Sequence, residues 1–344
     1  MSSHLGLDLG GTNIKWVVLD QDGTPLADGS LPTEGDGGPD HVVERLALAG
    51  HEAIAAAGPI ATAGVGVPGI YDATHGSIRF FTNLPGPWAG HPLGAPLSEA
   101  LGVPVRLIND ARAFTLAEAR VGAGKGCASL VGVTLGTGVG GGLVLQGKIW
   151  HGMTGMAGEL SHTNVEPEGH PCKCGSRGCL EQYASATAVK RLAQEAIASG
   201  TAPHMANALK QDVEFTSKKI FDLAMQGDAQ AKGIFERVGK ALGTVIADMV
   251  NIFNFPMYVV GGGVASAWDA FAPSMLETIG RNSFVYRNTA PYVNAAAGDA
   301  GGASVHGTII TRALLGSDAG LIGAARLPMI AGKANAPEAE LKRA

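Results

Sequence analysis

The sequence is poor in several features that mark particular protein classes. Of its 344 residues only 4 are cysteine and 16% are charged, and the net charge is −5. A negative balance gives no basic field for nucleic acid or for an anionic membrane surface. No apolar run approaches the roughly 20 residues that cross a bilayer, and Met1 to Gly11 holds no long apolar signal-peptide core. We therefore expect a cytoplasmic protein with small-molecule partners.

Glycine is abundant, with 51 residues, and 46% of the chain is hydrophobic. A chain of this size can form two packed lobes. The glycines cluster at the ends of apolar, strand-like runs, where backbone amides can approach a ligand. The run SLVGVTLGTGVGGGLVLQGKIW repeats the strand, glycine turn and strand of HLGLDLGGTNIKWVVL, which predicts two lobes of similar plan.

Other segments complete an α/β pattern. A third strand follows the QDG turn, and a helix is expected from about Asp40 to Ala57 with Asp40 as its cap. Strands are expected in ATAGVGVPGIYD, VRLIND and PMYVVGGGVAS, with helices in ARAFTLAEARVG and over most of 184–254. The expected lobes are 1–118 with about 308–330, and 119–307 with a metal loop at 162–181, followed by a flexible tail at 331–344.

Three of the four cysteines lie close together in CKCGSRGCLE, ten positions after a histidine: Cys172, Cys174, Cys179 and His162. Three thiolates and an imidazole form a tetrahedral zinc site. A disulfide is the rival, but Cys172 and Cys174 are too close in sequence to bridge easily. A zinc ion without any part in the chemistry is the other alternative.

Two further residues bear on this metal site. His170 lies two positions before Cys172 and can replace His162 as the fourth ligand. Cys127 opens the apolar run ASLVGVTLG and is expected to be a buried core thiol.

Three glycine loops are candidates for nucleotide binding, the first two for the phosphates and the third for a flat base or ribose. DLGGTNIK combines a carboxylate, backbone amides, a hydroxyl and a cation in Asp8, Gly10, Gly11, Thr12 and Lys15, a combination that suits polyphosphate and its magnesium. The second loop holds Gly136, Thr137 and Gly138, and the third holds Gly261, Gly262 and Gly263. An ordinary hairpin explains the first loop taken alone, whereas the three loops together favour a nucleotide site.

Acidic residues near these loops are candidates for the chemistry. Asp110 follows Asn109 at the end of VRLI and precedes a helix, so it is either an N-cap or a base that accepts the proton of an attacking hydroxyl. Glu159 and Glu181 flank the zinc ligands. They are either carboxylates that hydrogen-bond several neighbouring hydroxyls of a ligand or solvated surface groups.

In their order, DLGGTNIK, GVPG, NDARAF, LGTGVGGG, GELSH and CKCGSRGCLE resemble the ROK sugar kinases from about Leu5 to Ala325. The resemblance implies the two-lobed ribonuclease-H-like actin/hexokinase fold with a central cleft. It also implies ATP, Mg2+ and structural Zn2+ as cofactors, phosphorylation of a hexose at the 6-hydroxyl, and a homodimer or homotetramer.

Carried over by motif, Asp110 matches the catalytic base of the family and His162 matches both a zinc ligand and a sugar ligand. The other sugar-side matches are Gly69, Asn83, Asn109, Glu159 and Glu181. The segments Asp8–Lys15 and Gly136–Gly138 match the nucleotide-phosphate segments. Ser161 replaces the usual glycine before the histidine, which bears on the choice of hexose.

Glucose is the expected substrate. N-acetylglucosamine, N-acetylmannosamine, mannose or fructose are alternatives, with polyphosphate as an alternative donor. A sugar-responsive repressor is a distant alternative, and with seven residues before Asp8 we expect no DNA-binding helix-turn-helix. A zinc-ribbon interaction module needs a second cysteine pair, which the sequence lacks.

Overall fold

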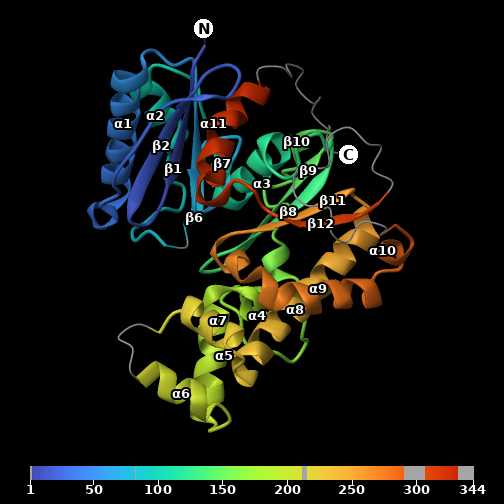
Figure 1. The fold of residues 1–344 in the computed structure, drawn as a ribbon. Helices are drawn as coiled ribbons and strands as arrows, with labels where there is room; N and C mark the ends of the chain where they lie inside the picture. The colour runs from blue at the N-terminus through green and yellow to red at the C-terminus, as the bar shows by residue number, and fades with distance from the viewer. Residues whose placement is uncertain (1, 82, 211–214, 290–306, 332–344) are drawn as a thin grey trace, which may run out of the picture. The chain divides into compact units, whose positions relative to one another are not determined.

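The computed structural model describes residues 2–81, 83–210, 215–289 and 307–331. It contains two compact units (Figure 1). The first unit comprises Met1–Ala117, Gly152–Gly155 and Asp318–Ala344, and the second comprises Glu118–His151 and Met156–Ser317. The expected flexible tail at 331–344 lies outside the described residues, apart from its first residue. No helix in the described part of the chain is long and apolar enough to cross a membrane.

The first unit is built on a five-stranded sheet with the order β3-β2-β1-β4-β7. Strands β1, β4 and β7 are parallel to one another, and β2 and β3 extend the sheet in antiparallel fashion. The strand bounds are His4–Leu9 for β1, Asn13–Leu19 for β2, Pro25–Pro32 for β3, Thr62–Val67 for β4 and Val105–Asn109 for β7. Parallel strands place their carboxyl ends, where ligands bind in such sheets, at one edge.

Helices cover both faces of this sheet because side chains alternate along its strands. Leu5, Leu7 and Leu9 share a core with buried residues of helices α1 (Gly38–Ala57) and α2 (Gly94–Leu101). Glycines take the opposite face, and a Cβ on Gly6 would lie 2.6 Å from the Leu321 carbonyl oxygen of helix α11 (Ala319–Ala331). The missing side chains let α11 lie close to β1 and β4 (Figure 1).

Helix α1 was expected to begin at Asp40, and this prediction is wrong in detail. Gly37 is the N-cap, and a proline lies at one of the first two positions of the helix. Asp40 therefore lies within the first turn. Proline suits the first turn of a helix because its fixed φ is helical and its missing N–H has no intrahelical acceptor there. The helix therefore starts two residues before the aspartate, and a short 3-10 turn, Gly35–Gly37, precedes it.

The second unit holds another five-stranded sheet, with the order β10-β9-β8-β11-β12. The strand bounds are Leu130–Leu135 for β8, Val139–Leu145 for β9, Lys148–Ile149 for β10, Met257–Gly261 for β11 and Ile309–Arg312 for β12. As in the first sheet, three strands are parallel and two extend the sheet in antiparallel fashion. The two sheets share one arrangement of parallel and antiparallel strands, which confirms the prediction of two lobes of similar plan.

A large helical layer packs with the second sheet. Its helices are α4 (Glu181–Ala184), α5 (Ala186–Ala198), α6 (Pro203–Lys210), α7 (Ser217–Met225), α8 (Ala229–Phe253), α9 (Trp268–Asn282) and α10 (Phe284–Thr289). The long α8 lies against α9 and packs with α4, α5 and α7 (Figure 1). Short 3-10 turns lie at Leu160–His162, Gly263–Ala267 and Gly316–Asp318. The expectation of a mostly helical 184–254 is confirmed within the described residues.

Helix α3 (Asp110–Val121) contains the change from the first unit to the second, after Ala117. The expected first lobe included residues from about 308, but β12 pairs with β11 and lies in the second unit. The first unit also contains a two-stranded hairpin of β5 (Gly69–Asp72) and β6 (Ser77–Phe81).

Candidate functional site

Two carboxylates influence each other in the first unit. Asp8 lies near the end of β1, and Asp110 begins α3 directly after β7 ends. Burial and then the negative charge of Asp110 raise the pKa of Asp8 to about 6, while Lys15, its cross-strand partner, acts in the opposite direction. The parallel strands thus bring two predicted site residues, far apart in sequence, to one edge of the sheet.

Asn109 provides the cap that the sequence also allowed Asp110 to provide. Its Oδ1 accepts hydrogen bonds from the N–H groups of Ala111 at 3.1 Å and Arg112 at 3.3 Å. Its Nδ2 donates to Asp110 Oδ1 at 2.8 Å and to the Gly69 carbonyl oxygen at 3.2 Å. The Asp110 side chain is exposed, and its carboxylate is oriented by Asn109 and by the Ala111 N–H at 2.8 Å.

The first glycine loop is a tight turn between β1 and β2. Gly10 N–H donates to the Asn13 carbonyl at 3.0 Å, and the Thr33 hydroxyl donates to the Gly10 carbonyl at 2.7 Å. A Cβ on Gly11 would lie 3.3 Å from the backbone oxygen of Asn83. The structure therefore brings Asn83, expected on the sugar side, next to the candidate phosphate turn. Thr12 and Lys15 are exposed beside it.

Gly69 begins β5 with a φ of 154°, a backbone conformation that other residues rarely adopt. It pairs with Phe81 in the hairpin, and its carbonyl accepts the Asn109 hydrogen bond. Gly69, Asn109 and Asp110 thus form one connected group in the first unit.

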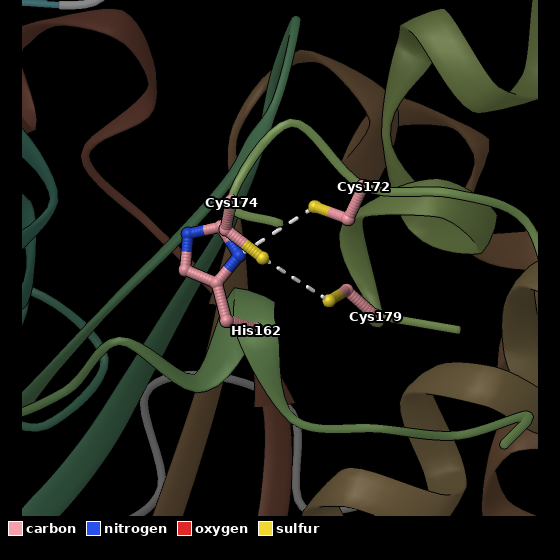
Figure 2. A group of neighbouring side chains, drawn as sticks. All are labelled: His162, Cys172, Cys174 and Cys179. Carbon is pink, nitrogen blue, oxygen red and sulfur yellow. Dashed lines mark hydrogen bonds between the residues drawn. The ribbon is translucent and has the colours of Figure 1, made fainter. Parts of the chain in front are cut away.

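The second unit brings together the four predicted metal ligands (Figure 2). Cys172 Sγ lies 3.8 Å from His162 Nδ1, and the Sγ atoms of Cys174 and Cys179 are 3.6 Å apart. All four donor atoms lie within 4.8 Å of one another. A tetrahedral ion with metal–sulfur bonds of about 2.3 Å needs donor separations of about 3.7 Å. The donor set therefore fits a tetrahedral metal ion.

A bound cation also favours the deprotonated form of these thiols. Burial and the neighbouring thiols of Cys174 and Cys172 raise the pKa of Cys179 to about 12. A divalent ion neutralises adjacent thiolates and removes this penalty. No disulfide joins these residues, so that alternative is wrong.

His170 is not part of this group. Its Nδ1 lies 2.9 Å from the carbonyl oxygen of Pro171, and the cluster found among the described residues contains His162 instead. Cys127 was expected in the core, but it is only partly buried and precedes β8. Burial raises the pKa of its thiol.

The metal loop, residues 162–181, contacts helix α8. Arg237 donates from Nη2 to both carboxylate oxygens of Glu166, at 2.9 and 3.0 Å, and its guanidinium lies 4.9 Å from the ring centroid of Tyr183. The buried Tyr183 in turn accepts a hydrogen bond from the His170 N–H through its hydroxyl, at 2.9 Å. These contacts join the loop, α4 and α8 into one support.

The second glycine turn lies beside the metal loop. Glu181 follows Cys179 by two residues and begins α4, and its Oε2 accepts the Val139 N–H at 3.1 Å. A Cβ on Gly138 would lie 2.5 Å from the same oxygen, so a larger residue there would displace the Glu181 carboxylate from this position. A predicted sugar ligand thus touches a predicted phosphate turn.

The third glycine loop meets the second at the carboxyl ends of β8 and β11. A Cβ on Gly262 would lie 2.6 Å from the backbone nitrogen of Leu135, the residue before Gly136. Gly262 has a φ of 86°, which favours glycine. Gly261 ends β11, paired with Thr134 of β8, and Gly263 begins the following 3-10 turn.

Glu159 and His162 belong to one short turn. Glu159 is the N-cap residue of the 3-10 turn Leu160–His162, and its carbonyl accepts the His162 N–H at 3.2 Å. Both side chains are exposed, whereas Ser161 between them is 3% exposed. Ser161, which replaces the glycine expected before the histidine, is therefore buried within the second unit.

Some supporting residues escaped the sequence reasoning. Thr187 donates from its hydroxyl to the Thr137 carbonyl at 2.8 Å, and Arg237 supports the metal loop. The only local signal for Thr187 is its place just after Ser185, which caps α5 by accepting from Ala188 N–H. Arg237 on α8 has no sequence signal at all, because its partners lie in distant loops.

Comparisons with known proteins agree with this arrangement. A family model described as the ROK family matches residues 4–329. The chain is 36% identical over 275 residues to a glucokinase of Thermotoga maritima, covering 80% of this chain and 86% of that protein. It is 35% identical over 327 residues to a glucokinase of Halalkalibacterium halodurans, covering 93% of each.

A solved structure is also similar. It is a ROK family glucokinase from Streptomyces griseus in complex with glucose and AMPPNP, with a TM-score of 0.73 and 30% identity. The match covers 95% of this chain and 99% of that chain. The predicted α/β class and actin/hexokinase-like fold are confirmed by this likeness.

Proposed function

This chain belongs to the ROK family, and from this membership we propose that it is an ATP-dependent glucokinase that phosphorylates the 6-hydroxyl of glucose. The observation that carries the proposal is the contact of Glu181 with Gly138 and with the Val139 N–H. A carboxylate that suits sugar hydroxyls and a glycine turn that suits phosphate meet there in one unit. A sugar kinase needs both recognition elements close to each other.

Asp110 is the proposed base. The glucose 6-hydroxyl oxygen forms a bond to the γ-phosphorus of ATP, the bond from that phosphorus to the β–γ bridging oxygen breaks, and ADP leaves. The hydroxyl proton passes to the Asp110 carboxylate. Asn109 supports this role because its Nδ2 holds Asp110 Oδ1 at 2.8 Å. In phosphoryl transfer the protein contributes mainly positioning and charge stabilisation, besides such a base.

Sugar recognition is assigned to exposed polar groups. Oε2 of Glu181 accepts from Val139 N–H, while its Oε1 has no hydrogen-bond partner among the described residues and can accept from a sugar hydroxyl. His162 turns Nδ1 toward Cys172, which assigns Nε2 to the sugar. Glu159 shares its turn with His162. The other residues assigned to sugar recognition are Asn109, Gly69 and Asn83.

Nucleotide binding is assigned to the glycine turns. Asp8, Thr12 and Lys15 suit the phosphates and their Mg2+, together with the backbone of Gly10 and Gly11. On the second unit the assigned residues are Gly136, Thr137, Gly138, Gly261, Gly262 and Gly263. Magnesium bound with ATP neutralises phosphate charge. Backbone amides at glycine turns bind anions without a side chain in the way.

Zinc is the proposed ion of the cluster His162, Cys172, Cys174 and Cys179, because this donor set and its spacing suit tetrahedral Zn2+. All four positions are taken by protein ligands, so the ion has a structural role. It holds the loop that carries His162 on one side and Glu181 on the other. The chemistry itself is assigned to the carboxylates and the amides.

The test is an ADP-release assay over glucose, mannose, fructose and the two N-acetylhexosamines, with ATP or polyphosphate as donor. We expect the highest kcat/KM for glucose with ATP. An N-acetylhexosamine as best substrate would keep the kinase and refute the glucose assignment, and phosphorylation of none of them would refute the proposal.

Replacing Asp110 by Asn tests the base. We expect kcat to fall by about 10²- to 10⁴-fold, while the affinity for glucose, measured by calorimetry, changes little. Asp269→Asn, in the first turn of α9, is the matched control and should retain wild-type turnover. Full turnover of Asp110→Asn would remove Asp110 from this role.

A further inference from the structure

The turn Gly136–Gly138 is held by the first turn of helix α5. The Gly136 carbonyl accepts the Ala186 N–H at 2.9 Å, and the Thr137 carbonyl accepts the Thr187 hydroxyl at 2.8 Å. Inside the turn, Gly136 N–H donates to the Gly138 carbonyl at 2.9 Å. Every carbonyl of the turn is therefore occupied by a defined donor.

These carbonyl contacts fix the direction of the neighbouring amides. In a planar trans peptide the C=O of one residue and the N–H of the next point in opposite directions. The contact of the Gly136 carbonyl with Ala186 therefore directs the Thr137 N–H away from α5. The contact of the Thr137 carbonyl with Thr187 does the same for the Gly138 N–H.

Both amides are available to a ligand, as far as the described part of the chain shows. Among the residues that the structure describes, no hydrogen-bond acceptor is found for the N–H of Thr137 or of Gly138. Successive N–H groups that point the same way form a concave anion site. The next amide differs, since Val139 N–H is taken by Glu181. Two amides of the turn thus remain for a phosphate group.

The start of helix α5, which supports the turn, is rigid. Ser185 is 2% exposed and caps α5 by accepting the Ala188 N–H at 3.0 Å. Thr187 lies in the first turn of α5, and its branched side chain has few rotamers in a helix. Tyr183 and Ala184 are buried just before it. The Thr187 hydroxyl is therefore held in place without help from a ligand.

We propose that Thr187 is a positioning residue that aims the Thr137 and Gly138 amides at the phosphates of the nucleotide. The proposal rests on the proposed function, because it takes this turn as a phosphate site. Thr187 lies eight positions after Cys179, on the helix that directly follows α4, so the last metal ligand and the support of the phosphate turn are close in sequence. Thr187 itself touches the turn, and its effect on phosphate passes through the peptide plane of Thr137.

The test compares Thr187→Val with Thr187→Ser. Valine keeps the branched shape and removes the donor, while serine keeps the donor. For valine we expect the KM for ATP and the Kd of a non-hydrolysable ATP analogue to rise about three- to tenfold, the effect of one hydrogen bond. The KM for sugar and the melting temperature should remain near wild type, and serine should restore most of the nucleotide affinity.

Thr244→Val is the matched control. Thr244 also lies in a helix and donates from its hydroxyl to a backbone carbonyl, that of Lys240, at 3.0 Å. It should leave nucleotide affinity unchanged. Wild-type affinity for the analogue in Thr187→Val would overturn the positioning role and leave the kinase assignment intact. An equal loss of sugar affinity, nucleotide affinity and melting temperature would also overturn it, because that pattern indicates a structural role.

The wild-type protein separates this proposal from the proposed function. If the wild-type chain binds the analogue and phosphorylates a hexose, only the Thr187 series decides the positioning role. Absence of both properties in the wild type would refute the proposed function, and the positioning role with it.

Discussion

The carboxylate of Glu118 accepts the N–H of Leu315 at 2.8 Å, although the two residues are 197 positions apart in the chain. The same carboxylate accepts from Leu314 at 3.0 Å and from Ala123 at 2.8 Å, and Glu118 is 0% exposed. One buried carboxylate therefore satisfies three amides, on the loop after α3 and on the chain after β12.

Glu118→Gln should lower the free energy of unfolding by about 2–4 kcal/mol, because an amide nitrogen replaces one acceptor at this buried side chain and leaves a backbone N–H without its partner. Chemical denaturation measures the change, and hydrogen exchange should show reduced protection at Leu314 and Leu315. Glu277→Gln, at an exposed position of α9, is the control. A Glu118→Gln protein as stable as wild type would contradict this account of the buried carboxylate.

The raised pKa of Asp8 predicts a pH-dependent stability. Its pKa is about 6 in the folded protein against 3.8 for an ordinary aspartate. Between these values the folded state binds more protons than the unfolded state, so the free energy of unfolding falls as the pH rises. Above pH 6 the destabilisation is complete and amounts to roughly 3 kcal/mol. A carboxylate that destabilises the fold at neutral pH is typical of functional sites.

Asp8→Asn should therefore be more stable than wild type at pH 8, and the difference should disappear as the pH falls toward 4. Urea denaturation across this range measures it. Asp28→Asn, at an exposed position of β3 in the same sheet, should follow the wild type throughout. A constant difference between Asp8→Asn and wild type from pH 4 to 8 would refute the assigned cause.

Much of the candidate site could be predicted because its parts are contiguous in sequence. Three cysteines within eight residues, with a histidine ten positions before the first, limit the geometry to a small loop. The first two glycine turns were recognisable because each lies between two apolar strands, and a strand, turn and strand repeat indicates the same sheet plan twice. Asp110 was identified by its place at the end of a strand, where parallel sheets present functional groups.

Contacts between distant segments could not be predicted in this way. The sequence allowed Asp110 as the cap of α3, and only the contacts of Asn109 with Ala111 and Arg112 show that Asn109 provides it. Thr187 supports a turn 50 positions away. Strand β12 has only four residues, Ile309–Arg312, and nothing local in it indicates that its partner is β11.

The metal loop is supported by a residue with no sequence signature, and this yields a prediction about zinc. Arg237 holds Glu166 through two hydrogen bonds and lies over the ring of Tyr183. Both partners flank the ligands, Glu166 before Cys172 and Tyr183 after Cys179. Partners beyond the ligands fix ligand orientation, and their loss typically costs 10- to 100-fold in metal affinity. Arg237 contacts these partners and not the ligands themselves. We therefore expect its loss to lower the metal affinity by about two- to tenfold.

Arg237→Met keeps the apolar stem and removes the guanidinium. Its bound zinc should transfer to a chromogenic chelator two to ten times faster than that of the wild type, and the KM for the sugar should rise because His162 is the proposed ligand of both zinc and sugar. Lys240→Met, an exposed lysine on the same helix, controls for loss of charge. Zinc content per chain, measured by elemental analysis before the chelator is added, should be one in all three proteins. An unchanged transfer rate in Arg237→Met would show that the loop holds its shape without α8.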